Sequence, residues 1–184
     1  MAEHVCPVWV GHLLASPLRK LVQNPKRILE PHVEPGMTVL DVGSAMGFFS
    51  LPLARLVGPG GKVLAVDAQA GMINALRKKA KRAGLLDRLE PRLCSSTSLD
   101  LTGYQGRIDF ALAFAVVHEV PDPSNLFREL YDLLKPNGRL LLVEPRGHVP
   151  PKIFETTVAA AKQTGFKDLD RPRIRRSLAA LLKK

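Results

Sequence analysis

Short apolar runs alternate with longer amphipathic segments along most of this chain. The apolar runs are rich in valine, isoleucine and leucine and are bounded by glycine, proline or charged residues, which predicts strands at 39–41, 62–67, 89–93, 108–114, 139–143 and 166–170. Segments with apolar residues every three or four positions lie between most of these runs and predict helices at 47–57, 70–83, 122–134 and 150–165. We interpret this pattern as helix and strand alternating throughout, as in an α/β fold with a mostly parallel sheet.

A loop of small residues follows the first predicted strand. Gly43 and Gly47 bracket this loop, which lets backbone N–H groups at a helix N-terminus approach a ligand closely. Asp41, just before it, would repel a pyrophosphate and would hold an ammonium group. Asp67 ends the second strand twenty residues beyond Gly47, at the spacing where such an acid reaches ribose hydroxyl groups. An acid for an amino group, a backbone cradle and an acid for a ribose together indicate S-adenosylmethionine.

From Glu34 onward the chain resembles the class I S-adenosylmethionine-dependent methyltransferases. The stretch 41–47 is similar to the family's acid followed by Gly-x-Gly-x-Gly, with Ala45 in place of the middle glycine. We expect that methyl group to be tolerated if the φ angle of Ala45 is negative. Residues 107–130 and 133–145 resemble the family's fourth-strand and fifth-strand blocks. Ordered blocks of this kind are more specific than a glycine loop alone.

The resemblance implies a three-layer Rossmann-like α/β fold. Its seven-stranded, mostly parallel sheet would have the order 3-2-1-4-5-7-6 and carry helices on both faces. Local propensity at 177–182 favours helix, but the family topology requires a seventh, antiparallel strand there, and we predict the strand.

The resemblance also implies which residues contact the cofactor. Ser95 stands where the family usually offers an acid to the adenine amino group, and a hydroxyl can still accept that hydrogen bond. The expected cofactor-binding residues are Asp41, Gly43, Ser44, Ala45, Met46, Gly47, Asp67, Ala68, Gln69, Met72, Ser95, Ser96 and Phe114.

Three residues beyond the fourth and fifth strands are candidates for catalysis: His118, Glu119 and His148. Methyl transfer from a sulfonium can rely on positioning, so a base is needed only for a hydroxyl or a protonated amine acceptor. His118 has an ordinary pKa near neutrality, although it could instead cap or pack at the strand–helix junction. Glu144 could contact the acceptor, anchor a helix N-terminus or pair with Arg146.

Composition narrows the functional classes. The chain has 184 residues, 46% of them hydrophobic and 24% charged, as expected for one globular domain. The apolar run at 5–14 is too short to span a bilayer and no basic n-region precedes it, so we expect a cytoplasmic protein without a membrane partner. Cys6 and Cys94 lack metal-ligand spacing, so no metal site is predicted. Nothing in the sequence indicates an oligomeric state.

The net charge of +10 raises the question of a nucleic-acid partner. The basic residues at 77–82 lie on a predicted amphipathic helix and fit a solvated face, and others are spread over 167–184. The fourth strand continues into Ala115-Val116-Val117-His118 rather than an Asn-Pro-Pro-Tyr-like motif, which disfavours methylation of nucleic-acid bases. We therefore predict methyl transfer to a small-molecule acceptor by in-line displacement. An RNA or protein methyltransferase and a non-catalytic S-adenosylmethionine-binding protein are the alternatives.

The cofactor motifs all follow residue 38, so the sequence divides into a cofactor-binding methyltransferase domain at 34–184 and a segment at 1–33. Prolines after Cys6, Ser16 and Asn24 predict three short helices in that segment. The first of these helices carries an apolar stripe, which would be exposed to water unless it packed against another part of the protein. We expect the segment to be a helical lid over the acceptor site.

Overall fold

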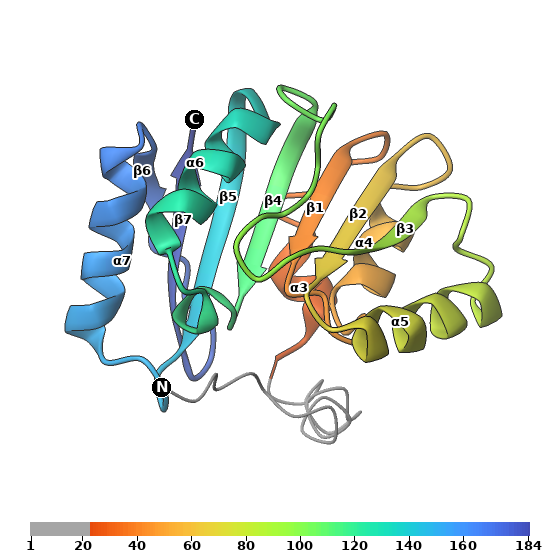
Figure 1. Ribbon diagram of the computed structural model, residues 1–184, viewed down its shortest axis with the longest axis horizontal. Helices are drawn as coiled ribbons and strands as arrows, with labels where there is room; N and C mark the ends of the chain where they lie inside the picture. The colour runs from red at the N-terminus through yellow and green to blue at the C-terminus, as the bar shows by residue number, and fades with distance from the viewer. Residues whose placement is uncertain (1–22) are drawn as a thin grey trace.

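The computed structural model describes residues 23–184, whose strands form one seven-stranded sheet with helices on both faces (Figure 1). The sheet order is β3-β2-β1-β4-β5-β7-β6, and β7 is antiparallel to both of its neighbours. The order and the Rossmann-like architecture predicted from the sequence are confirmed. The strands are β1 (Thr38–Val42), β2 (Lys62–Asp67), β3 (Leu89–Leu93), β4 (Ile108–Phe114), β5 (Leu134–Pro145), β6 (Lys167–Asp170) and β7 (Ser177–Lys183).

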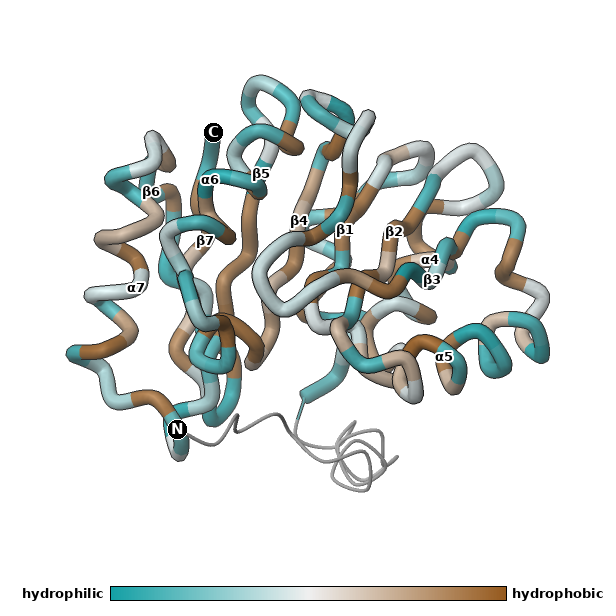
Figure 2. The backbone as a smooth tube through the Cα atoms, in the orientation of Figure 1, coloured by the Kyte–Doolittle hydropathy of each residue, from teal (hydrophilic) through white to brown (hydrophobic). Residues whose placement is uncertain are grey.

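The helices of the described chain are short and mostly amphipathic. In α5 the buried side chains recur at helical spacing while its lysines and arginines alternate with them, a pattern visible in Figure 2. The first residue of α6 follows Asp122, whose carboxylate accepts the N–H of Asn125 at 3.0 Å and so caps the helix. The helices are α3 (Pro25–Leu29), α4 (Ser50–Leu56), α5 (Ala70–Arg82), α6 (Pro123–Leu133) and α7 (Pro151–Gln163), with a 3₁₀ turn, η1, at Val117–Glu119.

Two hydrophobic cores lie on opposite faces of the sheet, because successive residues of a strand point to opposite sides. Leu40 and Leu64 belong to the core that contains the buried residues of α6 and α7. Their neighbours Val39 and Val63 belong to the core that contains those of α3, α4 and α5. The central strands are therefore buried on both faces, as their continuous apolar runs predict.

The last segment is a strand, as predicted against its local helix propensity. β7 pairs with β5 from Arg139 opposite Lys183 to Pro145 opposite Ser177. A ladder of this length, together with burial of most of its side chains, outweighs a preference of a few tenths of a kcal/mol per residue, roughly the spread of helix propensities among these residue types.

The prediction that helix and strand alternate throughout is wrong between β3 and β4. No helix lies in that part of the described chain, and an irregular segment crosses the front of the sheet instead (Figure 1). Its serine and threonine side chains bond to nearby backbone groups, which competes with helix formation, as where the N–H of Ser98 donates to the hydroxyl of Ser95 at 2.9 Å. Leu99 and Leu101 of this segment still pack into the core.

Two elements begin at least three residues away from their predicted starts, whereas the other bounds differ by two residues or fewer. α4 begins at Ser50 rather than residue 47, because Gly47 has a φ of +86°, which is incompatible with a right-handed helix. β5 begins at Leu134 rather than residue 139, and residues 136–138 form a bulge within the strand, where Asn137 has a φ of +67°.

The third of the predicted N-terminal helices is confirmed as α3, with the side chain of Asn24 as its N-cap. The first two predicted helices, and with them most of the expected lid, lie outside the described residues. Leu29 and Val33 are buried in the core with α4, and Gln23 donates a hydrogen bond to the hydroxyl of Ser177 at 3.1 Å. In the described part of the chain, no helix is long and apolar enough to cross a bilayer.

Candidate active site

A cleft of about 720 Å³ opens at the carboxyl ends of the central parallel strands. It is lined by the residues that follow β1, β2 and β4, together with the segment after β3. This edge is where ligands bind in open α/β sheets, because the loops that follow adjacent parallel strands meet there. The arrowheads of β1, β2 and β4 mark the edge in Figure 1.

The glycine loop after β1 is held in a conformation that tolerates few side chains. A Cβ atom at Gly43 would lie 2.6 Å from the Cγ2 atom of Val116, and Gly47 combines positive φ with a close approach to Leu76. Ala45, between them, has a φ of +45°, so the condition under which its methyl group was expected to be tolerated, a negative φ, is not met. This left-handed conformation costs roughly 1–2 kcal/mol for a residue with a Cβ atom. The N–H of Ala45 donates to Asp67 Oδ2 at 2.9 Å, which offsets part of that cost.

Asp67 lines the cleft where β2 ends, and its carboxylate organises two loops. Its Oδ2 atom accepts the N–H of Ala45 and its Oδ1 atom accepts the N–H of Gln69, each at 2.9 Å. Burial raises the pKa of Asp67, and these two hydrogen bonds oppose that shift. Each carboxylate oxygen accepts more than one hydrogen bond, so both can still receive a hydroxyl group from a ligand.

Three of the predicted cofactor residues are not among those that line the cleft: Asp41, Ser44 and Gly47. The Asp41 carboxylate is buried and accepts the hydroxyl of Ser50 at 2.5 Å, and burial raises its pKa to about 7. The Ser44 hydroxyl is buried and has no hydrogen-bond partner among residues 23–184. A direct contact of Asp41 with an ammonium group therefore stays a prediction. The remaining predicted cofactor residues line the cleft together: Gly43, Ala45, Met46, Asp67, Ala68, Gln69, Met72, Ser95, Ser96 and Phe114.

The Ser95 hydroxyl is occupied by its own turn. It accepts the N–H groups of Ser98 at 2.9 Å and Thr97 at 3.3 Å, and it donates to the carbonyl oxygen of Ser98 at 3.3 Å. One donor and two lone pairs are then all in use. The role expected for this hydroxyl, acceptance of a hydrogen bond from an adenine amino group, would require this turn to open.

His118 lies in the 3₁₀ turn that follows β4, directly above the end of β5. Its Nδ1 atom is 2.6 Å from Glu144 Oε2, and its backbone N–H donates to Glu144 Oε1 at 3.2 Å. Glu144 is buried and His118 is partly exposed on the cleft. The hydrogen bond to Glu144 raises the pKa of His118 and holds its ring in place, while burial partly opposes the shift. Nε2 is therefore the ring atom available to a bound molecule.

Glu119 and His148, the other two predicted catalytic residues, also line the cleft. The ring of His148 stacks on that of His118, with centroids 6.2 Å apart. Glu119 Oε1 lies 3.9 Å from His118 Nε2. Burial is the largest cause of the raised pKa of Glu119, and His118 opposes the shift.

Sequence reasoning missed how two glutamates shape the cleft. Glu144 does not pair with Arg146, which donates instead to the carbonyl oxygen of Ser177, and it supports His118 from below. Glu129 of α6 accepts the N–H of Leu99 at 2.8 Å and so fixes the segment after β3. The only signal for Glu129 in the sequence is Asn125 four residues before it, whose side-chain amide donates to Glu129 at 3.0 Å.

Residues 33–172 match a family model described as a methyltransferase domain. The chain belongs to this methyltransferase family. The resemblance to the class I S-adenosylmethionine-dependent methyltransferases is thereby confirmed. This methyltransferase domain also has the fold of a solved S-adenosylmethionine-dependent methyltransferase from Aquifex aeolicus, with a TM-score of 0.86 at 24% identity over 97% of this chain and 98% of that one.

Two curated relatives share part of the domain. A ubiquinone biosynthesis O-methyltransferase from Ruegeria pomeroyi is 36% identical over 103 residues, which are 56% of this chain and 39% of that protein. A ubiquinone/menaquinone biosynthesis C-methyltransferase from Escherichia coli is 30% identical over 112 residues, which are 61% of this chain and 44% of that protein. The matched part is thus less than half the length of either relative.

Proposed function

We propose that this protein is an enzyme that transfers the methyl group of S-adenosylmethionine to a small-molecule acceptor. The observation that carries the proposal is a single cleft that joins the Gly43–Met46 loop and the Asp67 carboxylate to a histidine backed by a buried glutamate. The first two features suit the cofactor, and the third suits removal of a proton from an acceptor.

The residues of the cleft fit this cofactor in position and chemistry. Asp67 presents carboxylate oxygens at the end of β2, where they can accept hydrogen bonds from the ribose hydroxyl groups. Met46 and Met72 offer an apolar lining beside it, and the volume of about 720 Å³ lies within the range of ligand pockets. When bound, S-adenosylmethionine supplies an electrophilic methyl group on a sulfonium.

His118 is suited to act as the general base. A carboxylate only accepts hydrogen bonds, so the Glu144 carboxylate selects the ring tautomer with its proton on Nδ1. Nε2 is then the basic atom. It can take the proton of a hydroxyl or thiol group as that group attacks, or remove a proton from an ammonium group so that the resulting amine can attack. A positioned base of this kind contributes roughly 10²–10⁴-fold to a rate. Glu144 touches only His118 in this scheme and is a positioning residue.

A small acceptor is supported by the concave form of the site and by the relatives. Both curated relatives are named as methyltransferases of ubiquinone or menaquinone biosynthesis, and the chain matches only part of each. Because the match covers less than half of each relative, we take from their names only the chemical class of the acceptor, a small molecule.

The test is methyl transfer by the purified full-length protein. The protein would be incubated with S-adenosylmethionine labelled on its methyl group and with a cellular metabolite extract from which macromolecules have been removed. We expect label in a small product and loss of most of that label with the His118→Asn variant. Binding of the cofactor without transfer to any small molecule would contradict the proposal, and label in added RNA or protein alone would favour the corresponding alternative.

A further inference from the structure

The cleft is acidic although the protein is strongly basic. The chain has 27 lysine and arginine residues, yet none of the described residues that line the cleft is a lysine or an arginine. The cleft is lined instead by four carboxylic acids and two histidines. The acids are Asp67, Glu119, Asp122 and Glu129.

Several basic side chains are bonded to backbone carbonyl groups. Lys79 donates to the carbonyl oxygen of Met46, a residue of the glycine loop, at 3.2 Å. Arg77 donates to the carbonyl oxygen of Pro91 at 3.1 Å, and Arg146 to that of Ser177 at 3.0 Å. These hydrogen bonds hold Lys79, Arg77 and Arg146 against backbone carbonyl groups. An anionic ligand in the cleft could pair with one of these side chains only if its hydrogen bond were broken.

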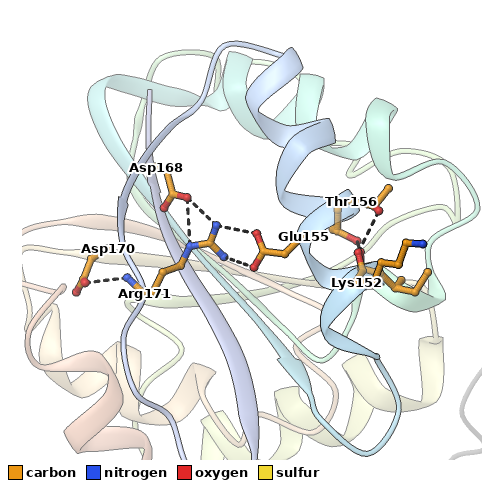
Figure 3. Close-up of polar contacts among 8 residues, drawn as sticks. Lys152, Glu155, Thr156, Asp168, Asp170 and Arg171 are labelled. Carbon is orange, nitrogen blue, oxygen red and sulfur yellow. Dashed lines mark hydrogen bonds and ion pairs between the residues drawn. The ribbon is translucent and has the colours of Figure 1, made fainter.

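Arg171, one of the basic residues in the last part of the sequence, is paired with two acids. Arg171 forms paired hydrogen bonds with both carboxylate oxygens of Glu155 at 3.0 Å and also contacts Asp168 at 2.7 Å (Figure 3). These residues belong to α7 and to the end of the sheet at β6, and none of them lines the cleft. The positive charge of the protein is therefore carried by its outer surface.

Anionic ligands are normally held by arginine, lysine or a helix N-terminus, and a carboxylate that faces them repels them. Glu119 is the acid best placed to act on an acceptor, because its carboxylate is 3.9 Å from Nε2 of His118, the proposed proton-accepting atom. An acceptor positioned at Nε2 is therefore within a few ångströms of that carboxylate.

We propose that the acceptor bears no anionic group and that Glu119 enforces this selectivity by repelling acceptors with a carboxylate or phosphate near the methylated atom. The inference rests on the proposed function, whose acceptor class it narrows to neutral and cationic molecules. It also disfavours nucleic acids, since their phosphates would have to approach this edge of the cleft.

The test divides the same metabolite extract by charge. An anion exchanger at neutral pH retains molecules with a net negative charge, and each pool is offered to the full-length protein with methyl-labelled S-adenosylmethionine. Because zwitterions pass with the neutral and cationic pool, a labelled product from that pool is also checked by mass spectrometry for a carboxylate or phosphate, and the presence of one would overturn the inference. We expect label only in the neutral and cationic pool. Label in the anionic pool alone would overturn the inference and leave the proposed function standing, whereas no transfer in either pool would overturn both.

A pair of variants tests the part played by Glu119. Once an acceptor has been found in the neutral and cationic pool, kcat/KM is measured for that acceptor and for an analogue of it that carries one added carboxylate. Glu119→Gln should raise the ratio for the anionic over the parent acceptor by about tenfold or more, since a like charge at this range is worth at least that factor. Asp87→Asn makes the same change of charge at an exposed residue outside the cleft and should leave the ratio unchanged. An unchanged ratio in Glu119→Gln would overturn the role assigned to this residue.

Discussion

The imidazole of His118 and the carboxylate of Glu144 form a hydrogen bond of 2.6 Å, between Nδ1 and Oε2, at the floor of the cleft. The Glu144 side chain is 1% exposed, whereas that of His118 is 27% exposed. The glutamate is therefore sealed behind the histidine, and only the histidine can meet an acceptor. This arrangement gives His118 a fixed orientation and a raised pKa.

Glu144→Gln should lower the pKa of His118, because it removes the charge that favours the protonated ring. The shift can be measured by NMR titration of the His118 ring proton on Cε1. His32, whose pKa is lowered mainly by burial and by Arg139 rather than by any group of the cleft, provides an internal reference. An unchanged His118 pKa in the folded variant would show that Glu144 is uncharged beneath the ring.

The same variant should change stability in a pH-dependent way. The pKa of His118 is raised above 6.5 in the folded state, so its protonation stabilises the fold fully below that pH, and the stabilisation is lost as pH rises through the raised value. The difference in unfolding free energy between the wild type and Glu144→Gln should therefore be largest near pH 6 and narrow by pH 8. Urea unfolding at both pH values measures it, and a pH-independent difference would indicate packing alone.

Methyl transfer should rise with pH through the raised pKa of His118, because the base must be unprotonated to accept a proton. In Glu144→Gln the inflection should move to lower pH as the maximal rate falls. His118→Asn should remove the inflection and reduce kcat about 10²–10⁴-fold, with cofactor affinity changed only a few-fold. If both variants lowered the rate but left the inflection of the pH profile where it is in the wild type, His118 would have a structural role and would not be the base.

The sequence predicted the sheet well because its central strands are buried on both faces, so each appears as an apolar run that ends at a charged or turn residue. The bounds of β2, β3 and β4 match those predictions. The segment between β3 and β4 could not be predicted in the same way. Its two buried leucines, Leu99 and Leu101, are spaced as in a strand or loop, and the acid that holds the segment, Glu129, lies 30 residues from Leu99.

The candidate site was predictable where contacts are local. Asp67 is the last residue of its strand, and the glycine loop is continuous in sequence. The pairing of His118 with Glu144 spans 26 residues and depends on the parallel register of β4 with β5. The positive φ angle of Ala45 could not be read from the sequence, because the N–H of this residue bonds to Asp67, which lies 22 residues away.

Ala45→Gly should stabilise the protein by up to about 1 kcal/mol, because glycine adopts the φ of +45° without the penalty of a Cβ atom, although it also loses more conformational entropy on folding. The change is seen as a higher midpoint in urea unfolding. Ala68→Gly is a matched control in the same cleft, at a residue without positive φ, and should not stabilise. Destabilisation by Ala45→Gly would show that the loop is not strained at this position.

Asp41→Asn should stabilise the protein more at pH 8 than at pH 5. Burial raises the pKa of Asp41 from 3.8 to about 7, so between these values the folded state binds a proton that the unfolded state has lost. Stability then falls as pH rises through this window, and asparagine, which carries no charge, removes the fall. Unfolding free energies at the two pH values measure the effect. An equal difference at both would mean that Asp41 ionises normally despite its burial.

Asp67→Asn should weaken S-adenosylmethionine binding about a hundredfold or more, because two charge-assisted hydrogen bonds to ribose hydroxyl groups are worth about 1.5–3 kcal/mol each. Isothermal titration calorimetry measures the dissociation constant. Asp67→Ala should weaken binding further, because it leaves the N–H groups of both Ala45 and Gln69 without an acceptor, whereas the single amide oxygen of asparagine can still accept one of them. Asp87→Asn changes an exposed acid that does not line the cleft and should leave the dissociation constant within a few-fold. An unchanged constant in folded Asp67→Asn would mean that the ribose is bound elsewhere.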